Sequence, residues 1–247
     1  MKPIRFIVAL AMSAPLVAQA QQDWREMDWG EFFVRIGSSY VDPNGDATPL
    51  KFAVLQHWDL YNTTWEFNSD TTWNVSAVWR PMEHWGVELV QVGDAQYDID
   101  LAHFTAIPGR DVIPLGDFKV SSSTAFINWY PLGADCLGRP YFGIGVNYTD
   151  FRDGNLSREF SDYLIDTDLA TGRGSFNLGY SWGWATQLGV DFTYSHDTPF
   201  LANLSVLYFQ SDTTARVIFP TRLGHDHLRS DVDYDPWVVN LSIGYKF

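Results

Sequence analysis

The residues most suited to catalysis are histidines close to acidic side chains. His196 directly precedes Asp197 in HDTP, and His84 lies in RPMEH, another short turn-like segment. A hydrolase needs a nucleophile such as serine beside a histidine base that a carboxylate orients. Neither histidine lies on a strand-like segment that could hold it against such a nucleophile. The sequence therefore predicts no catalytic residues, and a lipid-modifying enzyme is kept only as an alternative.

Metal-binding residues are sparse as well. His225 and His227 flank Asp226, so two imidazoles could meet one metal ion. A protein metal site needs a third and a fourth ligand at defined spacing, and none is evident, which favours a solvated polar loop. The single cysteine, Cys136, excludes an internal disulfide in a monomer and offers no thiolate cluster. We predict neither a metal site nor a cofactor.

The N-terminus has the layout of an export signal. Lys2 and Arg5 precede the apolar core FIVALAMSAPLVA, and Ala18-Gln19-Ala20 supplies a small-x-small cleavage site. The apolar core is too short for a spanning helix. We expect residues 1–20 to be a signal peptide and residues 21–247 to form the exported protein, the alternative being a buried N-terminal helix.

The charge balance is acidic, with 16 Lys and Arg against 30 Asp and Glu. Loss of Lys2 and Arg5 with the signal leaves 14 (16 − 2) basic residues and a net charge of −16 (14 − 30). This balance argues against a nucleic-acid partner, which needs a basic surface. Aromatic residues make up 16% of the chain, yet no segment after the signal is apolar for long enough to form a spanning helix. These features favour a transmembrane β-barrel, whose alternating strands hide the membrane signal.

The C-terminal segment DPWVVNLSIGYKF shows this alternation most clearly. Trp237, Leu241 and Phe247 fall on one apolar face, whereas Asn240 and Ser242 fall on the other, as successive strand residues do. Seven further segments of about ten residues alternate in the same way: 30–41, 71–79, 85–97, 118–130, 140–151, 180–195 and 200–217. The count predicts an all-β fold, an eight-stranded antiparallel transmembrane β-barrel.

The connections between these segments alternate between long and short. The long ones are 42–69, 98–116, 152–179 and 216–235, and the short ones are 80–84, 131–138 and 195–199. Pro108 and Pro114 are expected to exclude regular structure from 98–116. Small barrels of the bacterial outer membrane have long extracellular loops and short periplasmic turns. A soluble β-sandwich is the alternative, but the second face is rich in small and polar residues, unlike a packed sandwich core. The apolar face is therefore expected to contact outer-membrane lipid and lipopolysaccharide.

Several strand segments resemble the OmpW family of small outer-membrane proteins. The resemblance rests on WGEFFVRIG, GVELV, RPYFGIGVNYTDF, SWGWATQLGVDF, NLSVLYFQSDTTARV and the C-terminal segment, in that order along the chain. It departs from the family at 113–123, IPLGDFKVSSS, where many relatives have a His-Leu-Pro-Pro type segment. The loop 42–69 is also aromatic and polar rather than glycine-rich, so loop chemistry cannot be carried over.

The resemblance implies an outer-membrane channel for small hydrophobic molecules, with lateral release into the bilayer. It places a constriction of two apolar residues at Val90 and Leu207, and the alternation aims both inward. The alternation also places Val78, Val92, Phe209, Arg35 and Glu88 in the lumen, where we expect Arg35 and Glu88 to pair. The alternative for Val90 and Leu207 is that they only fill the barrel. A structural or receptor barrel without transport is the alternative function.

The C-terminal residue, Phe247, ends the strand that would close the barrel against the first. A closed barrel leaves no sheet edge exposed to lipid. We expect this strand to be the part of the chain that the barrel-assembly machinery binds.

Overall fold

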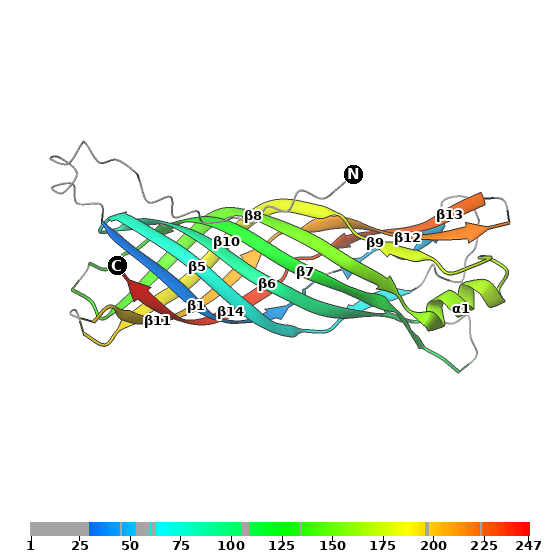
Figure 1. The fold of residues 1–247 in the computed structure, drawn as a ribbon, viewed down its shortest axis with the longest axis horizontal. Coiled ribbons are helices and arrows are strands. Elements are labelled where there is room, and N and C mark those ends of the chain that lie inside the picture. Colours follow the sequence, from blue (N-terminus) through cyan, green and yellow to red (C-terminus); the bar gives the residue numbers. More distant parts are fainter. Residues whose placement is uncertain are drawn as a thin grey trace, which may run out of the picture.

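A computed structural model describes residues 30–247, apart from 45, 53–59, 61–62, 105–108, 134, 196–197 and 223. The predicted signal peptide and the pair His196 and Asp197 lie outside the described residues. Strands dominate the described chain and wind around one long axis (Figure 1). Among the described residues, no helix has the length and apolarity needed to cross a membrane.

Eight long antiparallel strands form a closed ring. They are β1 (Glu31–Asp42), β5 (Asp70–Met82), β6 (Trp85–Ala102), β7 (Val112–Trp129), β8 (Gly138–Leu156), β10 (Tyr180–Thr193), β11 (Phe200–Phe209) and β14 (Trp237–Lys246). The order around the ring is β6-β5-β1-β14-β11-β10-β8-β7, and β7 pairs again with β6. First and last strands therefore meet, as β1 pairs with β14. This confirms the predicted eight-stranded barrel.

The two ends of the barrel differ, and the connections define them. The turn end carries the short connections β5–β6, β7–β8 and β10–β11 together with the C-terminus, and the loop end carries the long connections (Figure 1). At the turn end Phe247 donates its backbone N–H to the Phe32 carbonyl at 2.9 Å. The last residue is thereby fixed to the first strand, as expected for the closing strand.

Alternation along the strands separates an apolar outer surface from the lumen. On β14 every second residue from Trp237 to Tyr245 is exposed, and the residues between them are buried. Large aromatic side chains gather on the outside near both ends of the strands. At the turn end they are Trp79, Trp85, Trp129, Phe192, Phe200 and Tyr245; at the loop end they are Tyr40, Trp73, Tyr180, Trp182 and Trp237. Such paired girdles flank the apolar band of outer-membrane barrels.

The connections predicted to be long loops contain regular structure. A second sheet at the loop end combines β2 (Asp46–Ala47), β3 (Lys51–Phe52), β9 (Ser175–Asn177), β12 (Asp212–Thr221) and β13 (Gly224–Asp233). A short strand, β4 (Thr64–Phe67), extends the main sheet beside β6, and a helix, α1 (Arg158–Asp166), lies at the loop end (Figure 1). The amphipathic helix is capped by Ser157, whose hydroxyl accepts the Phe160 N–H at 3.0 Å.

The prediction of one continuous strand over 200–217 is wrong. The Gln210 N–H bonds the Trp184 carbonyl, but the next N–H, that of Ser211, turns to the Asp235 carboxylate at 3.1 Å. The chain therefore leaves the barrel wall between Phe209 and Asp212 and continues as β12, which pairs with β13 instead of β10. The alternation continues through this break, so periodicity alone could not reveal it.

The prediction that 98–116 lacks regular structure is also wrong. β6 continues to Ala102 and β7 begins at Val112, so Pro114 lies within a strand. Pro114 faces Asp100 where the β6–β7 register shifts. A proline fits a strand at such an irregularity because its missing N–H breaks no ladder bond there.

Cys136 provides a native test of which barrel end faces the periplasm. The only cysteine of the chain is partly exposed in the β7–β8 turn. We expect a maleimide reagent of about 5 kDa, which is too large to pass through a small barrel, to label Cys136 only after the outer membrane is permeabilised. The matched control is Arg222→Cys in a Cys136→Ser background, because Arg222 lies at the β12–β13 tip. That variant should label on intact cells, and the reverse pattern would invert the topology.

Candidate functional site: the barrel lumen

The two predicted constriction residues both point into the lumen. Val90 on β6 is 5% exposed and Leu207 on β11 is fully buried. Their sequence neighbours Leu89 and Val206 are exposed on the outer surface. β6 and β11 lie four steps apart in either direction around the ring, so the two side chains project from opposite walls.

Strand registers place Val90 and Leu207 at nearly the same height. We followed the paired residues from strand to strand around the ring, starting at Val90. The route through β5, β1 and β14 reaches β11 at Leu201. The route through β7, β8 and β10 reaches the level of Ser211. Because barrel strands tilt, the two routes drift by the same amount in opposite directions along the barrel axis. The β11 residue at the same height as Val90 therefore lies midway between 201 and 211, one residue from Leu207. The two residues therefore face each other across the lumen.

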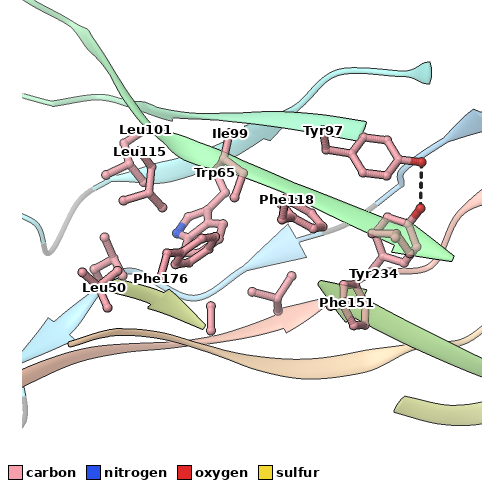
Figure 2. Close-up of a cluster of buried hydrophobic side chains, with 14 of the residues drawn as sticks. Leu50, Trp65, Tyr97, Ile99, Leu101, Leu115, Phe118, Phe151, Phe176 and Tyr234 are labelled. Atoms are coloured by element: carbon pink, nitrogen blue, oxygen red, sulfur yellow. Dashed lines mark hydrogen bonds between the residues drawn. The ribbon is translucent and has the colours of Figure 1, made fainter. Parts of the chain in front are cut away.

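A large cluster of apolar side chains lies in the lumen from this level to the loop end, beside buried, hydrogen-bonded polar residues such as Asn74, Thr124 and Asn147. Val92 and Phe209 belong to the same buried cluster as Val90 and Leu207. Toward the loop end the cluster becomes aromatic, and Figure 2 shows Trp65, Phe118, Phe151 and Phe176 gathered inside the strands. Buried residues of α1 complete the cluster: Phe160, Tyr163 and Leu164.

Two buried tyrosines cross this apolar section. The Tyr234 hydroxyl donates to the Tyr97 hydroxyl at 2.8 Å, joining the segment before β14 to β6 (Figure 2). Burial in these apolar surroundings raises the pKa of Tyr234 well above its usual range. The pair therefore stays neutral and satisfies two hydroxyls inside an otherwise apolar layer.

A charged cluster lies directly on the turn-end side of Val90. Arg35 donates from Nη1 to Glu88 Oε1 at 2.5 Å and from Nη2 to Asp191 Oδ2 at 2.7 Å. All three side chains are at most 6% exposed. The expected pairing of Arg35 with Glu88 is confirmed, while sequence analysis missed Asp191. The signal available in the sequence was the inward position of Asp191 within 180–195, a segment whose alternation is regular.

Amide side chains complete this cluster. Glu88 Oε2 accepts from Asn128 at 2.7 Å and from Gln187 at 2.9 Å, and Asp191 Oδ1 accepts from Asn203 at 2.8 Å. We call these six residues (Arg35, Glu88, Asn128, Gln187, Asp191 and Asn203) the polar plug. Gly143 lies against it, since a Cβ at that position would be 2.2 Å from Asn128 Oδ1. The plug is thus packed as well as hydrogen-bonded, and it closes the lumen below the apolar section.

One predicted lumen residue lies apart from the others. Val78 is fully buried but clusters with Phe33 and Leu201, level with the plug. Val78 pairs in register with Glu88, whereas Val90 and Val92 lie further along β6. The structure therefore brings together Val90, Val92, Leu207 and Phe209, and separates Val78 from them.

The other candidate residues lie away from the lumen. His84 Nδ1 is 2.8 Å from the Tyr130 carbonyl, a contact that fixes the β5–β6 turn. His225 and His227 lie on one side of β13, while Asp226 between them is buried on the other. Within the described residues, no group of three His, Cys, Asp or Glu side chains is arranged to hold a metal.

An exterior pocket of about 600 Å³ lies where β12 leaves the barrel wall, between β9–β10 and β12–β13. Asp212, Asp231 and Asp233 line it. Desolvation raises the pKa of Asp212, and the carboxylates of Asp233 and Asp235 raise it further. The folded state therefore binds a proton on Asp212 more tightly than the unfolded chain does.

This raised pKa gives a pH-dependent prediction. The stability that Asp212 contributes is present below the unfolded value of about 3.9 and is lost as pH rises through the folded pKa. Asp212→Asn should therefore unfold at a higher urea concentration than the parent at pH 7, and the difference should vanish near pH 3. An equal effect of the substitution at both pH values would contradict this assignment.

A closed eight-stranded ring with an apolar exterior, paired aromatic girdles and a filled lumen defines an outer-membrane β-barrel protein. The OmpW family model matches residues 28–247, and the chain belongs to the OmpW family. It is 31% identical to outer membrane protein W of Escherichia coli K12 over 218 residues, covering 88% of this chain and 89% of the relative. The protein is located in the bacterial outer membrane and is not an enzyme, as is true of the family.

Two further relatives extend the comparison. The crystal structure of outer membrane protein OprG from Pseudomonas aeruginosa superposes with a TM-score of 0.73 at 32% identity, covering 88% of this chain and 96% of that one. A P. aeruginosa protein named dibenzothiophene metabolism operon protein PahQ is 23% identical, covering 94% of this chain and 95% of the relative.

Proposed function

We propose that this protein passes small hydrophobic molecules across the outer membrane through the apolar section of its lumen. The observation that carries the proposal is the division of the lumen at Val90 and Leu207. Toward the loop end the lumen holds a large apolar and aromatic cluster together with hydrogen-bonded polar residues such as Asn74 and Asn147, and the charged polar plug fills it on the other side. An apolar solute gains free energy by replacing water contacts with such surroundings, at roughly 25 cal/mol per Å² buried.

The plug also bears on the exit route. A solute continuing along the barrel axis would have to separate Arg35 from Glu88 and Asp191, and breaking buried charge pairs costs several kcal/mol. An apolar molecule offers no hydrogen bonds to replace those it breaks. Sideways release into the bilayer avoids this cost and is the route we propose.

The relatives support the substrate class. PahQ is named for an operon of dibenzothiophene metabolism, and dibenzothiophene is an apolar fused-ring compound. The apolar cluster in the lumen of this chain, which is similar to PahQ, fits solutes of this kind. Val90 and Leu207 are the residues we assign to the narrowest part of the route.

The competing proposal is a receptor barrel without transport. An apolar core at the loop end would also stiffen a docking surface, because buried side chains immobilise the strands around them. Uptake of an aromatic probe by cells with and without the gene separates the two proposals. Faster uptake with the gene supports a channel, whereas equal uptake with normal surface display of the barrel supports a receptor.

A further inference from the structure

Three basic side chains converge on the turn end of the lumen. Arg80 on β5 and Arg139 on β8 are 4% and 6% exposed, and Lys246 on β14 is partly exposed. All three occupy inward positions on their strands, beyond the polar plug. We call them the basic mouth. Their gathering runs against a chain whose formal net charge is −14.

The hydrogen-bonding capacity of the two arginines is only partly used. Arg80 pairs with Glu31, and Arg139 Nη1 lies 3.9 Å from the same Glu31 oxygen. Arg139 also donates to the Glu83 carbonyl at 2.6 Å. Arg80 Nη1 and Arg139 Nε are buried and have no hydrogen-bond partner among the described residues. Buried guanidinium donors are almost always hydrogen-bonded, so we expect an acceptor to bind at these two atoms.

Carboxylates near the basic mouth do not supply that acceptor. Asp191 pairs in register with Arg139, but its two oxygens already accept from Arg35 and Asn203. Glu31 is 42% exposed and lies near both arginines. The Glu83 carboxylate also lies close enough to act on Arg139.

Aromatic rings hold the two arginines in place. The Arg80 guanidinium carbon lies 4.9 Å from the Tyr130 ring centre, and that of Arg139 lies 5.3 Å from it. Arg80 also lies 5.4 Å from the Phe33 ring centre. Stacking on one fixed ring keeps two like charges close together and limits the rotamers they can adopt. The donors are thus preorganised before a ligand arrives.

We propose that the basic mouth is a binding site for a small oxyanion, a phosphate or carboxylate group, that enters from the turn end. Guanidinium groups present paired N–H donors that match phosphate and carboxylate oxygens, and Lys246 adds a mobile point charge. The anion displaces the half-exposed Glu31 carboxylate and accepts from Arg80 Nη1 and Arg139 Nε. This site is separate from the apolar route and does not depend on it.

Arginine side-chain NMR tests the proposal directly. Protein carrying ¹⁵N-arginine, in a nonionic detergent without phosphate groups, is titrated with inorganic phosphate against chloride at matched ionic strength. We expect the Nε–H signals of Arg80 and Arg139 to shift saturably with phosphate, while the signal of the plug residue Arg35 stays in place. A parallel titration with a short-chain phosphatidate distinguishes a lipid headgroup from a free anion as the source. Signals that shift equally with chloride would overturn the proposal.

Two variants with opposite expected effects sharpen the test. Arg139→Gln should weaken phosphate binding at least about tenfold, because it removes a charge-assisted pair. Glu31→Gln should tighten binding, because it removes the internal competitor. Arg152→Gln, at an exposed ion pair with Asp94 on the loop-end side, is the control and should change nothing. If Arg139→Gln does not fold, Glu31→Gln still tests the proposed site. Unchanged or weaker phosphate binding by Glu31→Gln would contradict it.

Discussion

Replacing Arg35 by methionine should lower the free energy of unfolding of the barrel by about 3–5 kcal/mol. The substitution leaves Glu88 and Asp191 buried without the guanidinium that now bonds both of them. Two uncompensated carboxylates in a closed lumen carry a larger penalty than the loss of one exposed ion pair. Urea titration of the barrel in detergent micelles, followed by tryptophan fluorescence, measures the change.

Two further variants define the cause of this effect. Arg152→Met removes an arginine that is 46% exposed and paired with Asp94, and it should cost less than about 1 kcal/mol. The triple variant Arg35→Met, Glu88→Gln, Asp191→Asn removes all three charges and should recover part of the lost stability. A triple variant no more stable than Arg35→Met alone would show that packing, rather than charge, explains the loss.

The second large effect concerns the proposed constriction formed by Val90 and Leu207, which we call the neck. Val90→Asp together with Leu207→Asp should abolish the uptake of apolar probes, because the two carboxylates would draw water into the level of the lumen that we propose as the constriction. They would also lie directly above the polar plug, where two carboxylates already face one arginine. Carboxylates close together in a low-dielectric interior repel each other, and this repulsion raises the free energy of the folded barrel. Probe uptake by intact cells is the measurement.

Folding of the neck variants has to be separated from transport. The milder pair Val90→Asn and Leu207→Asn adds polarity without charge and should slow uptake while the heat-modifiable band of the folded barrel persists. The matched control is Val206→Asn, which places the same amide on the outer face beside Leu207. A folded neck variant that takes up probe at the parental rate would show that Val90 and Leu207 only fill the barrel.

The barrel wall could be predicted because its period is regular. The eight ring strands, their facing and the closure of β1 on β14 all follow from two-residue alternation and short turns. The second sheet did not follow, because hydrogen bonds from Ser211 to Asp235 and from Tyr234 to Ser211 fix the exit of the chain and leave the alternation intact. Pro114 misled the prediction for a related reason, as the register shift that accommodates it is a tertiary feature.

The lumen was predicted in part. Val90, Leu207 and the pair Arg35–Glu88 were identified from their inward positions. The polar plug as a unit was not, because Asn128, Gln187 and Asp191 come from three different strands and meet only once the registers are fixed. The alternation also gave no sign that Val78 lies in a separate cluster, level with this plug, from that of Val90.

Reconstitution into lipid vesicles tests the central claim most directly, that apolar solutes leave the lumen sideways and do not cross the plug. The purified barrel is incorporated into vesicles, and the arrival of a fluorescent apolar probe in the bilayer is timed beside the entry of a polar solute of similar size. We predict faster arrival of the apolar probe than in protein-free vesicles, with no added entry of the polar solute. Polar solute entering through the barrel, or an apolar probe arriving no faster with protein than without it, would contradict the account.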